Sequence, residues 1–343
     1  MRAGVLLTLL AGAGASVAAE PDRGALGSSA AQIFGPLPKE ATAPDRSLDE
    51  AQITLGRMLY YDPRLSKNHD ISCNTCHLLD QYGVDGEPTS KGHRGQRGPR
   101  SAPSVYNAAF HVSQFWDGRA KDVEEQAKGP ILNPIEMAMP DEASVVAVVK
   151  SIPGYPPLFA AAFPKEKNPV TYDNLAIAIG AFERRLVTPG RLDRFMEGDK
   201  NALTQEEVLG LKAFINVGCI TCHNGPTLGG LTYQKLGLLE PYETSDAGRF
   251  DVTGNETDRQ VFKVPSLRNI AKTGPYLHDG SIGNLNEIVI LMGRHQLGRK
   301  LTPAEVASIV AFLGALTGDI DAAYTAKPVL PASGPDTPGP DPS

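Results

Sequence analysis

The sequence predicts a mainly α-helical protein of two cytochrome c-like domains with long ordered loops, each domain built around one Cys-X-X-Cys-His motif. The motif occurs twice, at residues 73–77 and 219–223. Apolar residues recur at helical spacing along much of the chain, whereas no convincing alternating run predicts a strand. The composition, 41% hydrophobic and 21% charged with 35 glycines and 28 prolines, is typical of a globular protein with long loops between its helices.

The two ends of the chain are expected to lie outside these domains. Residues 1–19 have the positive start, short apolar core and small residues of a signal peptide cleaved near Ala19, so we expect export to the periplasm. An uncleaved anchor is disfavoured because the apolar core is shorter than the ~18 residues that a membrane helix needs. Residues 20–45 form an N-terminal extension. Residues 328–343 are rich in Pro, Gly, Asp and Ser and are expected to be disordered.

Capped amphipathic helices account for the α-helical prediction. A capping box opens three of them, at Ser47, Thr204 and Thr302, and an apolar stripe at helical spacing follows each. The predicted helices cover residues 47–59, 171–187, 204–215 and 302–313. The Val-Thr-Pro-Gly sequence at 187–190 breaks the pattern, which places the boundary between a domain of residues 46–187 and a domain of residues 188–327.

Cysteine usage predicts two covalently attached c-type hemes. All four cysteines lie in the two motifs, as Cys73, Cys76, Cys219 and Cys222. Two thiols three positions apart can reach the two vinyl groups of one heme, and the adjacent His77 or His223 comes up beneath the iron. A shared zinc site would separate its Cys pairs by ~15–20 residues, but 142 residues lie between Cys76 and Cys219. A redox Cys pair would explain one copy, not a histidine after both.

The residues by themselves leave the second axial ligand of each heme open. For the first heme the candidates are Met137, Met139 and His93. For the second heme they are His278, Met292 and His295. A thioether ligand would raise the potential of a c-type heme, although a plain core methionine is the more common use of this residue.

The charge of the chain bears on its partners. The formal net charge is −6 and the pI is near 5.7. No basic tract is present that could neutralise nucleic-acid phosphates, so nucleic acid is excluded as a partner. A mildly acidic surface favours a basic or neutral protein partner.

Residues 45–315 resemble the bacterial diheme cytochrome c peroxidases. The strings that carry the resemblance in the first half are Gly92-His93, residues 98–104 (GPRSAPS), 114–120 (QFWDGRA), 125–130 (EQAKGP) and Glu136-Met137. In the second half they are residues 264–269 (VPSLRN), 274–281 (GPYLHDGS) and 292–298 (MGRHQLG). Two heme motifs together with strings of this length are highly specific for the family.

The resemblance implies a peroxide-reacting role for the first heme, the one bound through His77. His93 would be its distal ligand in the resting oxidised state and would leave when the enzyme is activated. Glu136 would be the distal acid and base, and Gln126 a further residue of the distal pocket. Trp116, the only tryptophan, would lie between the two hemes, where a buried aromatic anchor is the alternative role.

The resemblance also implies an electron-entry heme and a calcium ion. The second heme, held by His223 and Met292, would be the high-potential site that receives electrons. Calcium would lie between the domains, bound by Ser101, by the carbonyls of Thr273 and Pro275, and by waters. The sequence departs from the family here, since asparagine is common where Ser101 stands. Serine still offers a hard oxygen.

The implied reaction is the reduction of hydrogen peroxide to water by two electrons from a small cytochrome c or a blue-copper donor, in an enzyme that can form a homodimer. Cleaving the O–O bond requires moving a proton from one oxygen to the other, which a nearby carboxylate can do. Two alternatives stay open. One is a non-enzymatic diheme electron carrier in which Met137 or Met139 closes the first heme. The other is a diheme oxidase that matures a protein-derived quinone cofactor, a class with tyrosine where Met292 stands.

Overall fold

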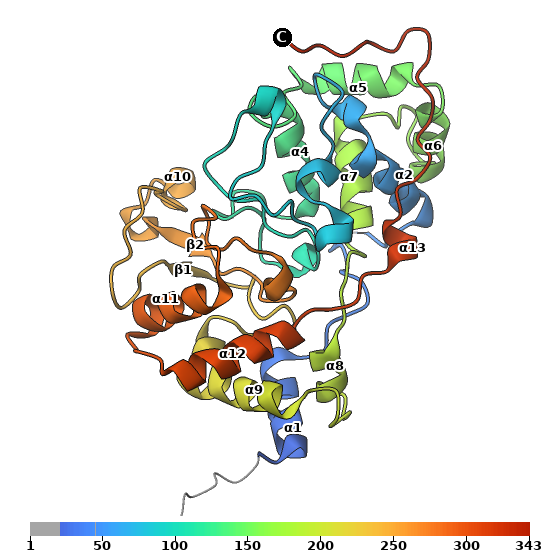
Figure 1. The fold of residues 1–343 in the computed structure, drawn as a ribbon. Coiled ribbons are helices and arrows are strands. Elements are labelled where there is room, and N and C mark those ends of the chain that lie inside the picture. The colour runs from blue at the N-terminus through green and yellow to red at the C-terminus, as the bar shows by residue number, and fades with distance from the viewer. Residues whose placement is uncertain (1–20, 45) are drawn as a thin grey trace, which may run out of the picture.

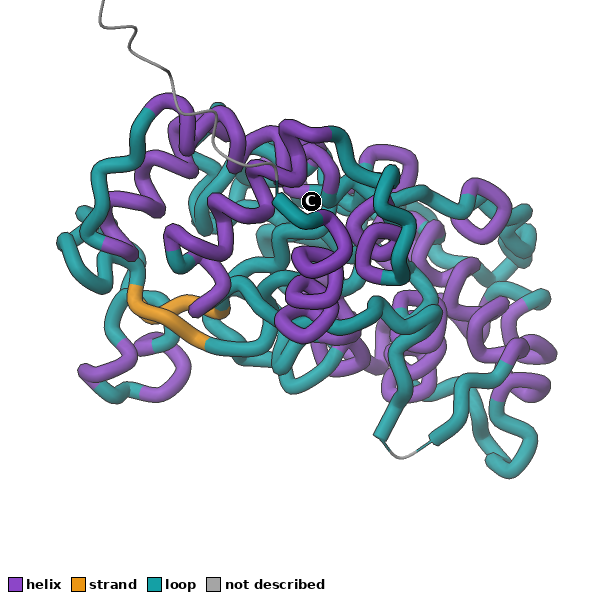
Figure 2. Tube along the Cα trace, turned by 90° about the horizontal axis from the view of Figure 1, so that it is seen from below, coloured by secondary structure: helices purple, strands orange, loops and turns teal. Residues whose placement is uncertain are grey.

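A computed structural model describes residues 21–44 and 46–343 of the chain. The predicted signal peptide and its cleavage point lie outside the described residues. The described part is mainly helical, as predicted, and long loops connect the helices (Figures 1 and 2). Buried apolar side chains in it form two clusters, one in an N-terminal lobe and one in a C-terminal lobe.

The N-terminal lobe is built on helices that enclose the first cluster. They are α2 (Glu50–Tyr61), α3 (Cys73–Cys76), α4 (Val123–Leu132), α5 (Glu142–Ser151), α6 (Tyr155–Ala162) and α7 (Tyr172–Glu183). The central pair is α2 and α7, which cross at Gly56: a Cβ atom there would lie 1.7 Å from the carbonyl oxygen of Ala178. Only glycine allows the two backbones to approach so closely.

The C-terminal lobe repeats this arrangement around the second cluster. Its helices are α8 (Arg191–Met196), α9 (Gln205–Val217), α10 (Phe250–Thr253), α11 (Leu285–Leu297) and α12 (Pro303–Ala315). Helices α9 and α12 cross at Gly210, where a Cβ atom would lie 1.9 Å from the carbonyl oxygen of Ser308. Each lobe therefore has one helix pair in contact through a glycine, and the helix that leads to the Cys-X-X-Cys-His motif belongs to that pair.

Two of the predicted capping boxes are confirmed. Thr204 and Thr302 cap α9 and α12, each with the glutamate three residues later bonded back to the cap. The box predicted at Ser47 is wrong. Helix α2 begins at Glu50, and Asp49 is its N-cap, because the Asp49 carboxylate accepts hydrogen bonds from the N–H groups of Ala51 and Gln52. A carboxylate two residues closer to the apolar stripe outcompetes the hydroxyl.

A small antiparallel sheet was not expected from the sequence. Strand β1 (Tyr233–Lys235) pairs with β2 (Val261–Lys263), with Gln234 opposite Phe262. Three-residue strands are too short to show an alternating pattern, so periodicity could not reveal them. The sheet lies between the helices of the C-terminal lobe and the loops of the N-terminal lobe (Figure 1).

The two ends of the chain each pack on the opposite lobe. Helix α1 (Arg23–Phe34), within the predicted extension, contributes Ala30 and Phe34 to the C-terminal cluster. Helix α13 (Ala322–Thr325) crosses back to the N-terminal lobe, where the hydroxyl of Tyr324 donates to the carbonyl oxygen of Phe182 at 2.7 Å. The segment after about residue 319 therefore packs on the other side of the boundary expected from the sequence.

The segment 328–343, for which the sequence predicts disorder, contains no helix or strand but makes specific contacts with the N-terminal lobe. The Arg64 guanidinium donates to the Ser333 hydroxyl, and the Thr337 hydroxyl donates to the carbonyl oxygen of Ser151. The N–H of Asp341 donates to the carbonyl oxygen of Lys67 at 2.9 Å. Figure 1 shows the segment running past α2 and α6. The amino-acid composition of the segment could not predict these contacts, because most of them are hydrogen bonds and do not require apolar residues.

The link between the lobes is held by hydrogen bonds to one buried threonine. The Thr188 hydroxyl accepts from the side-chain amides of Asn107 and Asn269, at 2.8 and 2.9 Å. Asn107 belongs to the N-terminal lobe and Asn269 to the C-terminal lobe. Both lobes therefore donate a hydrogen bond to Thr188, which lies within the predicted helix break at residues 187–190.

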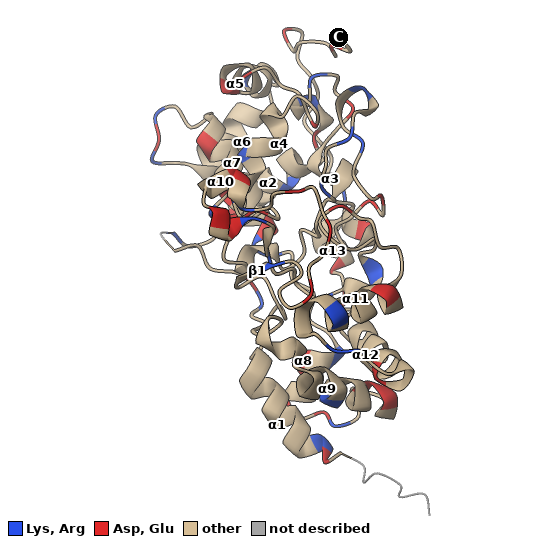
Figure 3. Cartoon of the chain, turned by 90° about the vertical axis from the view of Figure 1, so that its left-hand side faces the viewer, with Lys and Arg blue, Asp and Glu red and all other residues tan. Residues whose placement is uncertain are grey.

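No single helix in the described ranges is long and apolar enough to cross a membrane, and only the bent pair α5 and α6, at 109° to each other, meets those criteria when taken together. Figure 3 shows basic and acidic residues interspersed along the chain.

Candidate active site

The second Cys-X-X-Cys-His motif opens onto a cavity. Helix α9 ends at Val217, and its C-cap Gly218 is in the left-handed conformation (φ 103°), which turns the chain into the short helical turn Cys219–Thr221. Cys219, Cys222 and His223 line the cavity together with apolar side chains from several elements. The arrangement fits a covalently bound heme, since both thiols and the histidine face one mostly apolar space.

His223 is oriented by the backbone. Its Nδ1 lies 3.1 Å from the carbonyl oxygen of Leu228. A carbonyl can only accept, so Nδ1 carries the proton and Nε2 is left free to bind iron, the usual arrangement of a metal-ligating histidine. Burial lowers the pKa of His223 to about 4, which keeps the imidazole neutral.

The candidates for the second axial ligand of this heme differ in position. Met292, on α11, lines the same cavity as His223. His278 also lines it, but its Nε2 lies 3.1 Å from the hydroxyl of Thr244 and its ring stacks on Phe262. His295 is not among the lining residues, and its Nδ1 contacts the carbonyl oxygen of Glu240 at 2.9 Å. The positions favour Met292.

The first motif is arranged in the same way. Helix α3 begins at Cys73, after the N-cap Ser72, whose capping box is completed by Thr75. The Nδ1 of His77 lies 3.2 Å from the carbonyl oxygen of Gly83, which again leaves Nε2 free. The hydroxyl of Tyr60, in the last turn of α2, donates to the carbonyl oxygen of His77 at 2.8 Å. The first motif is therefore fixed to the helix pair that forms the core of its lobe.

The surroundings of the first pair of cysteines fit thioether attachment. Burial raises the pKa of the Cys73 thiol above its usual range and raises that of Cys76 to about 11. The cysteines, all within the described residues, form no disulfide. The buried hydroxyl of Ser90 lies next to the Cys76 sulfur. Buried and uncharged sulfurs are compatible with thioether bonds to a heme.

Glu136 is held in a turn that follows α4. The side-chain amide of Asn133 donates to Glu136 Oε1 at 2.9 Å, and the N–H of Glu136 donates to the carbonyl oxygen of Asn133 at 3.0 Å. Burial raises the pKa of Glu136, while the Arg119 charge and the Asn133 hydrogen bond act in the opposite direction. The charge of Glu136 also acts on the Cys76 thiol. The structure thus brings a half-buried carboxyl group near the first motif.

His93 lies against Glu136. The backbone N–H of His93 donates to the backbone carbonyl oxygen of Glu136 at 2.7 Å, and His93 is 5% exposed. Gly92 packs against the same turn, since a Cβ atom there would lie 2.0 Å from the carbonyl oxygen of Ile135. The His93 Nε2 lies 3.2 Å from the carbonyl oxygen of Ser343. The two residues expected on the distal side of the first heme are therefore neighbours.

Other expected residues of the first site have different surroundings. Gln126 lies on α4, two turns before Asn133, and is half-buried. Met137 and Met139, the ligands of the electron-carrier alternative, are 3% and 6% exposed and belong to the apolar cluster of the lobe. Their packing there matches the common role of methionine in a core.

The residues expected near calcium meet at the cavity of the second motif. Ser101, Thr273 and Pro275 all line it, as does Trp116. The Trp116 indole donates to the carbonyl oxygen of Ser101 at 2.9 Å, and the N–H of Ser101 donates to the carbonyl oxygen of His278 at 2.7 Å. Within the described ranges, no group of three or more His, Cys, Asp or Glu side chains could hold a metal, so a calcium site here would depend on carbonyl and hydroxyl oxygens.

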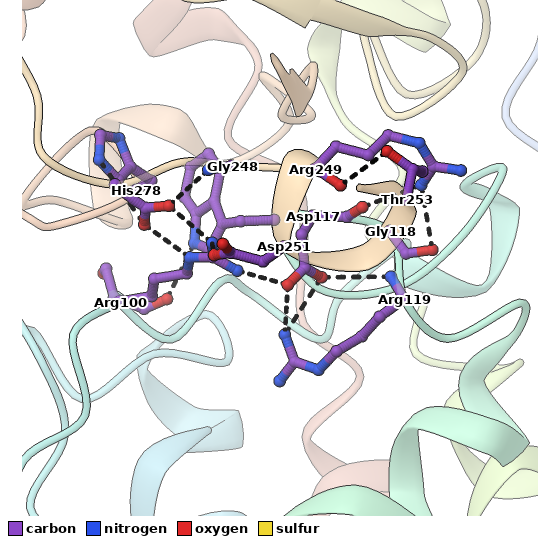
Figure 4. A network of polar contacts seen from close by, with 12 residues as sticks. Arg100, Asp117, Gly118, Arg119, Gly248, Arg249, Asp251, Thr253 and His278 are labelled. Carbon is purple, nitrogen blue, oxygen red and sulfur yellow. Dashed lines mark hydrogen bonds and ion pairs between the residues drawn. The ribbon is translucent and has the colours of Figure 1, made fainter. Parts of the chain in front are cut away.

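A polar network joins the lobes beside this region (Figure 4). The Arg100 guanidinium contacts Asp117 at 2.5 Å and Asp246 at 2.7 Å, and Asp117 also binds Arg119. The Arg249 guanidinium donates to the carbonyl oxygen of Asp117 at 2.9 Å. Arg100, Asp117 and Arg119 come from the N-terminal lobe, and Asp246 and Arg249 from the C-terminal lobe. The network fixes the loop that carries Trp116.

Sequence reasoning missed several residues of these sites. Asn133 and Arg119, which act on Glu136, lie inside the strings of the resemblance or next to them, but nothing in their spacing identified a role. His111 and Lys263 line the cavity of the second motif, and neither belongs to a recognisable motif. Only the folded chain brings them to the cavity.

Known proteins are similar to this chain over most of its length. The family model described as di-haem cytochrome c peroxidase matches residues 50–201. Cytochrome c551 peroxidase of Nitrosomonas europaea is 51% identical over 304 residues, which cover 88% of this chain and 89% of the relative. Cytochrome c551 peroxidase of Pseudomonas aeruginosa is 46% identical over 92% of both chains. The solved structure of a MauG-like protein associated with microbial copper homeostasis matches with a TM-score of 0.77 at 30% identity, covering 85% of this chain and 97% of that one.

Proposed function

The chain belongs to the di-haem cytochrome c peroxidase family, and from this membership we propose that it reduces hydrogen peroxide to water with electrons from a small cytochrome c or a cupredoxin. The observation that carries the proposal is the contact between His93 and Glu136. This backbone hydrogen bond supports the proposal because it brings together the residue proposed as the releasable distal ligand of the first heme and the residue proposed to move the proton. An electron carrier needs neither.

We assign the two heme attachment sites to the residues of the two motifs. Cys73 and Cys76 would hold the first heme, with His77 as proximal ligand and His93 as the ligand that is released. Cys219 and Cys222 would hold the second heme, with His223 and Met292 as its axial ligands. When bound, the hemes supply the redox chemistry, namely peroxide binding at the first and electron entry at the second.

Glu136 is the proposed acid and base of the reaction. Its raised pKa allows a proton to reside on the carboxyl group more readily than on an exposed glutamate. Glu136 would take the proton from one oxygen of the peroxide and deliver it to the other, the oxygen that leaves as water. The Asn133 amide holds Oε1 in one orientation, so Oε2 is the atom available for this transfer. Gln126 is proposed to line the same pocket.

Trp116 is proposed to lie between the two hemes. Its indole is fixed by the carbonyl oxygen of Ser101, and its own carbonyl oxygen accepts from the N–H of Lys263 at 2.8 Å. Both contacts hold the ring at the cavity wall between the lobes. A calcium ion bound by Ser101 and by the carbonyls of Thr273 and Pro275 would stabilise the same place.

Export to the periplasm, a homodimeric assembly and the choice of donor are further parts of the proposal. Export rests on the leader-like residues 1–19 and on the need to attach c-type hemes.

The diheme oxidase alternative is less favoured, because Met292 lines the second cavity where that class has tyrosine, and because the peroxidase relatives are more similar to this chain than the MauG-like structure is.

Steady-state kinetics test the proposed function. The holoenzyme is mixed with hydrogen peroxide and reduced cytochrome c, before and after mild reduction, and oxidation of the cytochrome is followed by absorbance. We expect turnover after reduction, with two cytochromes oxidised for each peroxide consumed. A protein with both hemes attached that oxidises no donor in either state would rule out the peroxidase and leave the electron carrier.

A further inference from the structure

Within the part of the chain that the structure describes, the buried ammonium group of Lys263 has no carboxylate partner. Its side chain, at the end of β2, is 6% exposed. The ammonium group donates to the carbonyl oxygen of Ser113 at 2.7 Å and lies 3.4 Å from His111 Nδ1. No ion pair of Lys263 occurs among the described residues. A buried charge is normally paired, because an unpaired one loses the solvation that water provides.

His111 presents an unmatched donor beside this cation. Its Nδ1 faces the Lys263 ammonium, which can only donate, so Nδ1 accepts and the ring proton is on Nε2. The Nε2 atom is buried and has no hydrogen-bond partner in the structure. Gly230 packs against the ring, since a Cβ atom there would lie 2.1 Å from His111 Cδ2. The ring is therefore confined, and its N–H points to no protein acceptor.

Both residues line the cavity of the second heme motif, where several other polar side chains are already matched. Arg268 is the other lysine or arginine of the lining, and its guanidinium pairs with the Asp193 carboxylate at 2.7 Å. The Ser266 hydroxyl donates to the carbonyl oxygen of Thr227, and that of Tyr276 to the carbonyl oxygen of Ile270. Lys263 is thus the basic side chain of this lining that has no carboxylate partner among the described residues, and the neighbouring His111 Nε2 has no acceptor.

We propose that Lys263 and His111 together bind a propionate carboxylate of the second heme, next to Trp116. A heme carries two carboxylates and is otherwise apolar, which matches a mostly apolar cavity with one cationic corner. The carboxylate would accept from the Lys263 ammonium and from His111 Nε2–H. Burial lowers the pKa of Lys263 to about 7, and an anion at this place would hold the amine in its charged form.

The proposed contact is shared by the two lobes. His111 and Ser113 belong to the N-terminal lobe, whereas Lys263 belongs to the C-terminal lobe and bonds through its N–H to the carbonyl oxygen of Trp116. The positive charge near the second heme would stabilise its reduced form, which carries one more negative charge. Lys263 and His111 would then help to set a high potential at the electron-entry heme and also fix the loop that carries Trp116.

The inference rests on the second motif carrying its heme and not on peroxide turnover, so the test uses potentials and vibrational spectra of the holoenzyme. The variants are Lys263→Met and His111→Phe, and Lys272→Met, an exposed lysine of the same lobe, is the control. Heme content is measured first. The reduced-to-oxidised ratio of the second heme at fixed potential should fall on the order of tenfold in Lys263→Met. Coulomb's law gives this size for a unit charge roughly 10 Å from the iron at an effective dielectric constant of about 20.

A second measurement separates direct binding from a structural effect. The propionate bending mode in the resonance Raman spectrum should shift in Lys263→Met and in His111→Phe but not in Lys272→Met, while the first heme keeps its potential. If Lys263→Met fails to fold, His111→Phe, which removes only the neutral donor, carries the test through the Raman shift. An unchanged propionate mode in a folded, fully loaded variant overturns the proposal. Absence of peroxidase activity in the wild type would overturn the proposed function and leave these readouts intact.

Discussion

The backbone N–H of His93 donates a 2.7 Å hydrogen bond to the backbone carbonyl oxygen of Glu136. Gly92 packs against the preceding carbonyl of Ile135 at a distance that excludes any side chain, so the two loops meet over at least two residues. Arg94 and Gly95, directly after the histidine, are in the left-handed conformation. A rearrangement that moves His93 would therefore begin at a strained turn and would disturb the loop that carries the proposed proton donor.

Glu136→Gln should separate proton transfer from peroxide binding. The amide keeps the shape and can still accept from Asn133, but it cannot carry the proton, so kcat should fall by about 10²–10⁴-fold while peroxide still perturbs the spectrum of the first heme. Stopped-flow absorbance and steady-state kinetics measure the two effects. Glu142→Gln, an exposed glutamate at the start of α5, is the control. Full turnover of Glu136→Gln would remove Glu136 from the mechanism.

His93→Gly should remove the gate of the first heme. We expect a five-coordinate first heme that reacts with peroxide even when the protein is fully oxidised, whereas the wild type should require prior reduction of the second heme, as in a shift between two populated states. Electron paramagnetic resonance and peroxide mixing report the two properties. His69→Gly, at another position with positive φ, should behave as the wild type. A resting wild type that is already five-coordinate and fully reactive would contradict the gating hypothesis.

Met292→His should lower the potential of the second heme and keep it six-coordinate, because the thioether favours ferrous iron more than imidazole does. A spectroelectrochemical titration with separate signals for the two hemes measures the change. His295→Ala should leave the titration as in the wild type, since His295 does not line the cavity. If the potential of Met292→His is unaltered, the ligand is His278 or His295 instead.

Removal of calcium should reduce activity or dimerisation reversibly if the ion lies where Ser101, Thr273 and Pro275 meet. Activity and mass in solution are measured in excess chelator and again after calcium is restored. Ser101→Asn adds a longer side chain with a carbonyl oxygen, a good calcium ligand, so this variant should resist higher concentrations of chelator. Full activity in chelator, with no metal found by elemental analysis, would exclude calcium from this site.

Glu183→Gln should change how stability depends on pH. The side chain is 5% exposed, and burial raises its pKa to about 8. Between the lower pKa of Glu183 in the unfolded state and its raised pKa in the folded state, the folded protein keeps a proton on Glu183 that the unfolded protein releases. The contribution of Glu183 is complete below the unfolded pKa and is lost as pH rises through the folded one.

The variant should consequently gain stability relative to the wild type as pH rises, by at most about 3 kcal/mol between about pH 6 and about pH 9. Denaturant unfolding of the heme-loaded protein at about pH 6 and about pH 9 gives the free energies of unfolding, with Glu142→Gln as the exposed control. A constant difference between Glu183→Gln and the wild type across this range would mean that Glu183 is ionised in the folded state.

The sequence by itself determined the features that depend on short stretches of chain. A Cys-X-X-Cys-His motif is complete within five residues, and the capping boxes at Thr204 and Thr302 are complete within four. Helix geometry couples residues three and four apart, so such patterns survive whatever the rest of the chain does. The local competition between Ser47 and Asp49 was misjudged, because both residues can cap a helix.

Tertiary structure alone decided which distant segments share a site. His93 meets Glu136, and His111 meets Lys263, because two separately packed helix pairs hold long loops against each other. The chain ends exchange lobes for the same reason: Phe34 is buried in, and Tyr324 packs against, a core formed elsewhere in the sequence. Burial depends on the sum of many weak contacts over the whole chain, and no local pattern records that sum.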